Sequence, residues 1–87
     1  MKIIEKKTWP DSFNKILSSQ KTFDARLDDF KIKNGDILVL REYDPTKKEY
    51  TGRIIEKKVS FILKTKDQKY WTTKEIQKYG LQIIGFK

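Results

Sequence analysis

The chain contains neither cysteine nor histidine in its 87 residues. Without cysteine there is no disulfide, no thiol nucleophile and no thiolate metal ligand. Without histidine there is no imidazole ligand and no histidine base for serine or cysteine catalysis. An enzyme made from this sequence would depend on Asp, Glu, Lys, Tyr, Ser or Thr. We therefore expect no metal and no cofactor, and we favour binding over catalysis.

Long apolar runs are also absent. The longest uncharged stretch, which includes Gly80–Phe86, is far shorter than the ~20 residues that a membrane-spanning helix requires. The first residues, Met1–Trp9, lack the apolar segment of a secretory signal. At this length the chain has room for one hydrophobic core. We expect a single cytoplasmic domain over residues 1–87 that does not enter a membrane, with its oligomeric state left open.

Positive charge is abundant and unevenly distributed. The chain has 20 Lys and Arg against 12 Asp and Glu, a net charge of +8. Residues 47–87 hold 11 basic and 4 acidic residues, so this half carries a net +7. Such a basic half favours a polyanion partner, through phosphate contacts and counterion release. The alternative is a solvated lysine-rich surface, since 17 of the 20 basic residues are lysine, which lacks the planar fork of arginine.

Hydrophobic periodicity and turn residues divide the chain into five strands and two helices. Phe13, Ile16 and Leu17 recur with helical spacing, and Thr72 with Glu75 matches a capping box. The predicted elements are strand 2–8, helix 10–19, strand 21–27, strand 37–43, strand 53–64, helix 72–79 and strand 81–86. This order predicts an α+β fold: a small mixed β-barrel of about five strands, with a helix between the first two strands and a short helix before the last.

The strand patterns also make finer predictions. The strand at 37–43 is apolar on both faces, so we expect it to be central in the sheet. Turn residues indicate a long hairpin connection from Asp44 to Gly52. In the strand after this connection, Val59, Phe61 and Leu63 are expected to share one face.

The second predicted strand begins with a motif. The residues that carry it read Ser19-Gln20-Lys21-Thr22-Phe23-Asp24-Ala25-Arg26. This stretch resembles the ASCH signature G-x-K-x-x-E-x-R, which follows a first helix and lies on the next strand in that family. The resemblance implies a PUA-like barrel. Two positions depart from the signature, because Ser19 replaces its glycine and Asp24 replaces its glutamate.

Later stretches extend the resemblance. Asn34-Gly35-Asp36-Ile37-Leu38 resembles the G-D-x-L turn of the same superfamily. A small bacterial and phage family of ASCH-like proteins of unknown function is similar in two stretches, Leu40-Arg41-Glu42-Tyr43-Asp44-Pro45 and Glu49-Tyr50-Thr51-Gly52-Arg53. The resemblance runs from about Lys2 to Leu63, whereas residues 65–80 do not match the family pattern. It implies an RNA-binding-like module.

The motif side chains are candidates for a ligand site. Strand alternation places Thr22, Asp24 and Arg26 on one face of the strand. If this face lines a polar cleft, Arg26 holds a phosphate or a carbonyl, and Asp24 accepts hydrogen bonds from a base edge or an amine. Lys21 then supplies positive charge at the rim. The alternative is a structural ion pair between Asp24 and Arg26 that fixes the strand register.

An aromatic and basic stretch before the second helix is a further candidate. Trp71 can stack a base beside Lys69, which helps to attract phosphate. Alternatively, Trp71 packs the second helix against the core. Nearer the N-terminus, Trp9 is expected in the core. Arg41 and Arg53, which flank the predicted hairpin, are expected to pair with neighbouring glutamates rather than with a ligand.

Three functions remain open. The first is a module that binds RNA or a nucleotide-like ligand, without catalysis, in a cleft beside Lys21, Asp24 and Arg26. The second is a nucleoside amidohydrolase, because some ASCH proteins resemble an enzyme that acts on acetylated cytidine with a lysine, a threonine and a glutamate. Lys21 matches that lysine, but Asp24 stands where the threonine nucleophile would be, and a carboxylate cannot simply replace the hydroxyl. The third is a protein-interaction or phage accessory domain whose basic face meets an acidic protein.

Overall fold

The structure, a computed structural model, describes residues 1–65 and 71–86. Its elements are β1 (Ile3–Thr8), α1 (Pro10–Leu17), β2 (Phe23–Leu27), β3 (Ile37–Asp44), β4 (Glu49–Lys64), α2 (Thr73–Tyr79) and β5 (Leu81–Phe86). The predicted order of strands and helices is confirmed. The N-cap half of the predicted capping box is present, because the Thr72 hydroxyl accepts a hydrogen bond from the Glu75 amide at 3.3 Å. The Glu75 carboxylate accepts a hydrogen bond from the Thr72 hydroxyl at 2.5 Å. Among the described residues, neither helix has the length and apolar character needed to cross a bilayer.

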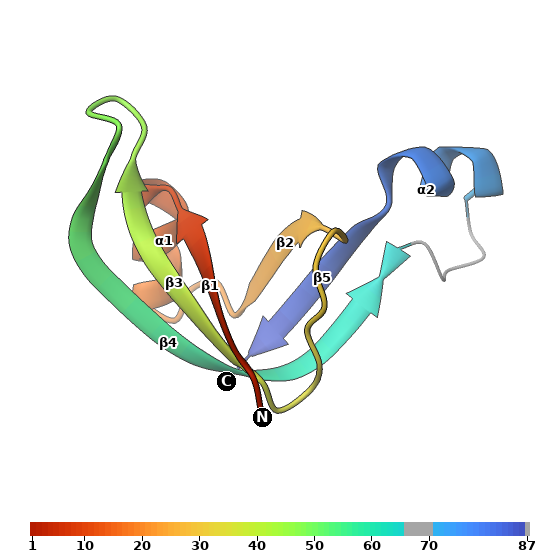
Figure 1. Ribbon diagram of the computed structural model, residues 1–87, viewed down its shortest axis with the longest axis horizontal. Coiled ribbons are helices and arrows are strands. Elements are labelled where there is room, and N and C mark those ends of the chain that lie inside the picture. The colour runs from red at the N-terminus through yellow and green to blue at the C-terminus, as the bar shows by residue number, and fades with distance from the viewer. Residues whose placement is uncertain (66–70, 87) are drawn as a thin grey trace.

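The five strands form one mixed sheet in the order β1-β3-β4-β5-β2. β1 runs parallel to β3, and every other neighbouring pair is antiparallel. The sheet curls into a half-barrel with two limbs (Figure 1). The first limb holds β1, β3 and β4 up to Lys58, and the second holds β4 from Val59, β5 and β2. The predicted barrel is therefore realised as a half-barrel: within the described sheet, β1 and β2 are its two edges, and β3 is central as predicted.

The long strand β4 runs through both limbs. Where the limbs meet, the alternation of its side chains between the two faces of the sheet is interrupted. Its pairing with β5 shifts register between Val59 and Phe61, so that one extra residue, Ser60, enters the strand. Val59 is consequently 1% exposed, whereas Phe61 is 62% exposed and Leu63 is 51% exposed. The prediction that these three side chains share a face is wrong, because this irregularity reverses the alternation.

The connection between β3 and β4 is shorter than predicted. β4 already begins at Glu49, which leaves only residues 45–48 as the turn. The Asp44 carboxylate accepts hydrogen bonds from the amides of Thr46 at 2.9 Å and Lys47 at 3.2 Å. Such an Asx turn reverses the chain in a few residues, and the strand residues on either side can then pair directly.

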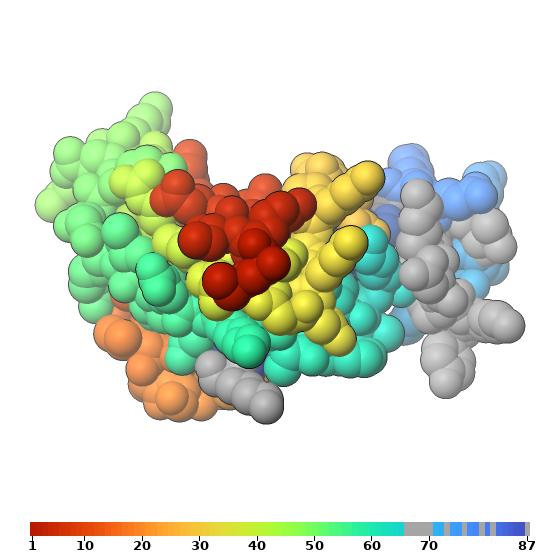
Figure 2. All heavy atoms as spheres, turned by 60° about the horizontal axis from the view of Figure 1, so that its bottom comes forward, coloured from red at the N-terminus to blue at the C-terminus, as the bar shows by residue number. Residues whose placement is uncertain are grey.

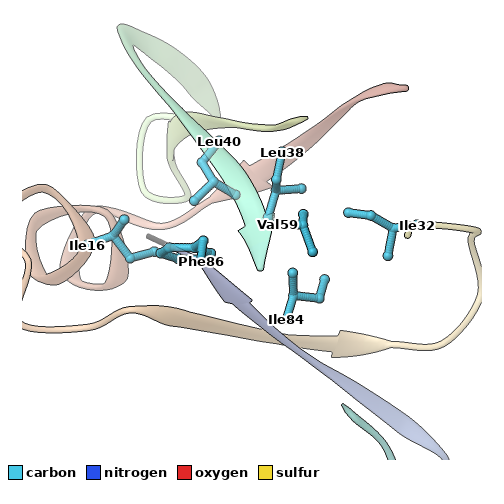
Figure 3. Packing of buried hydrophobic residues seen from close by; sticks show 7 residues of the cluster. All are labelled: Ile16, Ile32, Leu38, Leu40, Val59, Ile84 and Phe86. Atoms are coloured by element: carbon cyan, nitrogen blue, oxygen red, sulfur yellow. The ribbon is translucent and has the colours of Figure 1, made fainter. Parts of the chain in front are cut away.

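The hydrophobic core lies on the concave, inner face of the half-barrel. Its buried residues are Ile16, Ile32, Leu38, Leu40, Val59, Ile84 and Phe86 (Figure 3). They come from α1, from the segment between β2 and β3, and from both limbs, so the core holds all of these parts together. Phe13 on α1 is also buried, but Trp9 is 62% exposed, and the prediction that it belongs to the core is wrong.

The Gly35-Asp36 turn fixes the start of the chain. Gly35 has φ +91°, a left-handed conformation that glycine adopts readily. The buried Asp36 carboxylate accepts hydrogen bonds from the amides of Lys33 at 2.9 Å and Lys2 at 3.0 Å. These hydrogen bonds hold the pKa of Asp36 below its usual value. Figure 2 shows the N-terminal residues, in red, lying against this segment, in yellow.

Candidate functional site

The motif on β2 forms an ion pair on the inner face. Arg26 Nε donates to Asp24 Oδ2, and the two side chains are only 21% and 7% exposed. Arg26 Nη2 donates to the main-chain oxygen of Lys7 at 2.8 Å and to the Thr8 hydroxyl at 3.0 Å. One guanidinium therefore contacts both edges of the sheet, its own strand β2 and the end of β1.

A second ion pair lies on β3 and β4. Arg53 donates from Nε to Glu42 Oε1 at 2.8 Å and from Nη2 to Oε2 at 2.6 Å, and Nη2 also donates to Asn14 Oδ1 at 2.8 Å. The Thr51 hydroxyl donates to Glu42 Oε1 at 2.6 Å. The hydrogen bonds from Arg53 and then Thr51 lower the pKa of the buried Glu42 carboxyl. The predicted pairing of Arg53 with a neighbouring glutamate is confirmed.

These two ion pairs belong to one layer at the end of β1. Thr8, which Arg26 contacts, is the register partner of Glu42 in the parallel β1–β3 ladder, and both side chains are buried. We call Thr8, Asp24, Arg26, Glu42 and Arg53 the polar layer. In both arginines Nε and Nη2 are engaged, while Nη1 donates no hydrogen bond within residues 1–65 and 71–86. Each guanidinium is thus fixed in orientation by its partners among the described residues.

The other predicted motif residues lie apart from this layer. Lys21 is half-buried, and its Nζ donates to the Ser12 hydroxyl at 3.2 Å. Thr22 is exposed, and its carbonyl accepts a hydrogen bond from the Phe86 amide at 2.9 Å. The structure therefore brings Asp24 and Arg26 together, but it places Lys21 against α1.

Ser19, which stands at the position of the motif glycine, has a backbone conformation that glycine adopts readily. Ser19 has φ +64°, in the left-handed region, directly after the C-cap Ser18 of α1. The Lys21 amide then donates to the Lys15 carbonyl at 3.0 Å, which closes the helix end. The turn from α1 into β2 thus forms with a serine in the left-handed region, at a steric cost to Ser19.

The predicted base-stacking stretch before α2, with Lys69 and Trp71, lies only partly within the described residues. Trp71 is 60% exposed, so it does not pack the helix against the core as a buried side chain would. Lys69 lies outside the described residues. Base stacking by this pair stays a prediction.

The sequence reading missed a basic cavity between the segment before β3 and the end of β4. We call it the lysine cavity. It measures about 600 Å³ and is lined by Lys31, Ile32, Lys33, Asn34, Ile62 and Lys64. The sequence signal for this cavity was the alternation Lys31-Ile32-Lys33. In the structure the isoleucine is buried and both lysines are exposed. In the same part of the chain that is described, no cluster of three acidic side chains suited to a metal ion occurs.

Comparison with known proteins gives one finding. A family model described as Domain of unknown function (DUF3850) matches residues 3–78. No curated protein matches the chain. This match continues beyond Leu63, where the resemblance to ASCH-like proteins ended, and includes residues 65–78. The family description carries no activity, so the function has to be argued from the residues.

Proposed function

We propose a nucleic-acid-binding function for this chain, which belongs to the family described as Domain of unknown function (DUF3850). In this proposal it is an ASCH-like, PUA-like module that binds single-stranded RNA or a nucleotide-like ligand and does not catalyse a reaction. The lysine cavity carries the proposal. Three lysines line it and Asp28 pairs with only one of them, so the site carries a net positive charge that attracts an anion.

The lining of the cavity suits a phosphorylated ligand. Lys31 and Lys33 are exposed, while Lys64 is half-buried and lies 3.5 Å from Asp28, the one carboxylate paired with the cavity's lysines in the described residues. The isoleucines at positions 32 and 62 add an apolar surface beside the charges. Ammonium groups next to apolar area can hold a phosphate and shelter the attached sugar or base.

The ASCH-like motif enters the proposal as a second contact. Arg26 and Arg53 each present Nη1 from a fixed guanidinium, and Lys21 lies two residues before the strand that carries Arg26. A ligand phosphate or carbonyl at this end of the half-barrel would meet donors that are already oriented, which limits the entropy lost on binding. Asp24 holds the Arg26 guanidinium in place and so contributes to ligand binding indirectly.

Binding of a fluorescent single-stranded RNA across a series of salt concentrations tests the proposal. Affinity should fall by roughly 0.7 log units per log unit of salt for each phosphate contact. The variant Lys31→Gln/Lys33→Gln/Lys64→Gln should weaken binding and flatten this slope, whereas the exposed hairpin variant Lys47→Gln/Lys48→Gln is the matched control. Absence of binding at low salt, or an equal loss in both variants, would contradict the proposal. Equal binding of an acidic peptide would favour a protein partner instead.

One observation favours amidohydrolase activity as a second candidate. The Ser12 hydroxyl lies 3.2 Å from Lys21 Nζ, so a hydroxyl is within reach of the lysine that matches the enzyme motif. Release of acetate from acetylated cytidine tests this directly. Turnover that is lost in both Ser12→Ala and Lys21→Ala would support the enzyme, and no turnover in the unaltered chain would exclude it for this substrate.

A further inference from the structure

The outer face of the second limb carries two exposed phenylalanines in one cross-strand row. Gly85 on β5 pairs with Phe23 on β2 and with Phe61 on β4. Directly paired residues point to the same side of a sheet, so both rings lie on the face of Gly85. They are 47% and 62% exposed. The three strands form the limb at the right of Figure 1.

The space above Gly85 is open. A Cβ built at this position would meet only the Phe61 carbonyl oxygen and the Ser60 hydroxyl within 4 Å, each at 3.6 Å. Neither phenylalanine ring therefore covers the glycine. Neighbouring strands lie ~4.8 Å apart, so the backbones at Phe23 and Phe61 are separated by about twice that distance. The centre of the row, at Gly85, therefore has no side chain of its own between the two phenylalanines.

Positive charge lies near this row. Lys21 Nζ is 5.3 Å from the centre of the Phe23 ring. On β4, three residues before Phe61, the exposed Lys58 lines a shallow cavity together with Ser60. No carboxylate occupies an outward position of β2, β5 or the second-limb part of β4 among the residues described. The two lysines attract an anionic ligand to this face, and the Ser60 hydroxyl beside Gly85 offers one polar contact.

We propose that Phe23 and Phe61 form a stacking slot for one base of a single-stranded nucleic acid, with Lys21 and Lys58 contacting the phosphates on either side. The inference rests on the proposed RNA-binding function and names a surface on the opposite face of the sheet from the lysine cavity. Exposed aromatic rings beside cations are the common means of binding single strands without sequence preference. A second copy of the chain is a poorer occupant, because it would bring the same lysines onto this face and bury them.

Two probes separate stacking from phosphate contact: a short oligoadenylate, and an abasic ribose-phosphate chain of equal length. The unaltered chain should bind the oligoadenylate more tightly, because only that probe has bases. Phe23→Leu and Phe61→Leu keep apolar area but remove the rings, and each should reduce affinity for the oligoadenylate by about 5-fold to 150-fold, the range of one base stack. Affinity for the abasic chain should stay unchanged in both variants.

Two further variants sharpen the test. Gly85→Ala should fold normally, since its new methyl group makes only ordinary contacts, but it should weaken oligoadenylate binding by raising the floor of the slot. Leu63→Ala, one row away on the same face, is the control and should leave binding unchanged. Equal affinity of the unaltered chain for both probes would overturn the slot alone, whereas no binding of either probe would overturn the RNA-binding function as well. A dimer in sedimentation velocity that Phe61→Leu dissociates would assign this face to a second copy and overturn the slot.

Discussion

Arg26 on β2 donates a hydrogen bond from Nη2 to the main-chain oxygen of Lys7 on β1, at 2.8 Å. These two strands are the opposite edges of the described sheet, so this side chain joins edges that no backbone ladder connects. Its partner Asp24 has a side chain only 7% exposed. In a solvated cleft, water could replace a lost partner. The burial of the pair instead favours the structural ion pair that the sequence offers as the alternative.

The first prediction concerns this brace. Arg26→Ala leaves the Asp24 carboxylate buried without its partner, and we expect a loss of about 3–5 kcal/mol in the free energy of unfolding. Urea denaturation measures this loss. The double variant Asp24→Ala/Arg26→Ala should lose less than the sum of the two single variants, because it leaves no stranded charge. A loss of about 1 kcal/mol or less in Arg26→Ala would show that water does reach the pair.

The second prediction concerns the left-handed serine. Ser19→Gly removes the steric cost of φ +64° and should raise the free energy of unfolding by about 0.5–1 kcal/mol. For a domain of this size, each kcal/mol raises the melting temperature by about 4–8 °C. Ser18→Gly is the matched control, since its φ of −81° gains nothing from glycine. An unchanged or lower melting temperature in Ser19→Gly would contradict the prediction.

The third prediction concerns an aromatic cluster at the β3–β4 hairpin. The rings of Tyr43 and Tyr50 meet edge to face at 5.2 Å, and the Lys7 ammonium lies 4.1 Å from the Tyr43 ring. The Arg41 guanidinium lies 4.1 Å from the Tyr50 ring. Tyr50→Leu removes the ring contacts but keeps apolar area, so it should cost about 1–2 kcal/mol in unfolding experiments. An unchanged stability would mean that solvent compensates for both contacts.

Local chemistry made much of the fold predictable. The capping box at Thr72 and Glu75 placed α2, and the apolar residues of 37–43 placed β3 in the sheet interior. The two wrong predictions, on the face of Phe61 and the length of the β3–β4 hairpin, have a non-local cause. The face of Phe61 depends on one extra residue in β4, and the length of the hairpin depends on the Asp44 carboxylate. Both features are set by pairing between strands, which alternation within one strand does not reveal.

The candidate site was less predictable for the same reason. Strand alternation correctly put Asp24 and Arg26 on one face, but it could not show that Arg26 reaches β1. The contact of Lys21 with Ser12 joins two elements, and the lysine cavity brings Lys64 beside residues about thirty positions earlier. These are tertiary relations that follow from the curl of the sheet and leave no local pattern in the sequence.

The last prediction concerns acid stability and follows from Asp36 and Glu42. The pKa of each carboxyl is lowered in the fold, that of Asp36 mainly by the Lys33 amide and that of Glu42 mainly by Arg53. A carboxyl whose pKa is lower in the folded chain binds protons more readily when unfolded, so stability is lost as the pH falls. The free energy of unfolding should therefore be level above about pH 5.5 and decline steadily below about pH 4.5, as these groups take up protons. Urea denaturation between about pH 7 and pH 3 measures the decline, which Glu42→Gln and Asp36→Asn should each make shallower, while the exposed Asp11→Asn should leave it unchanged. Equal slopes in all four chains would contradict the assignment of acid sensitivity to these two carboxyls.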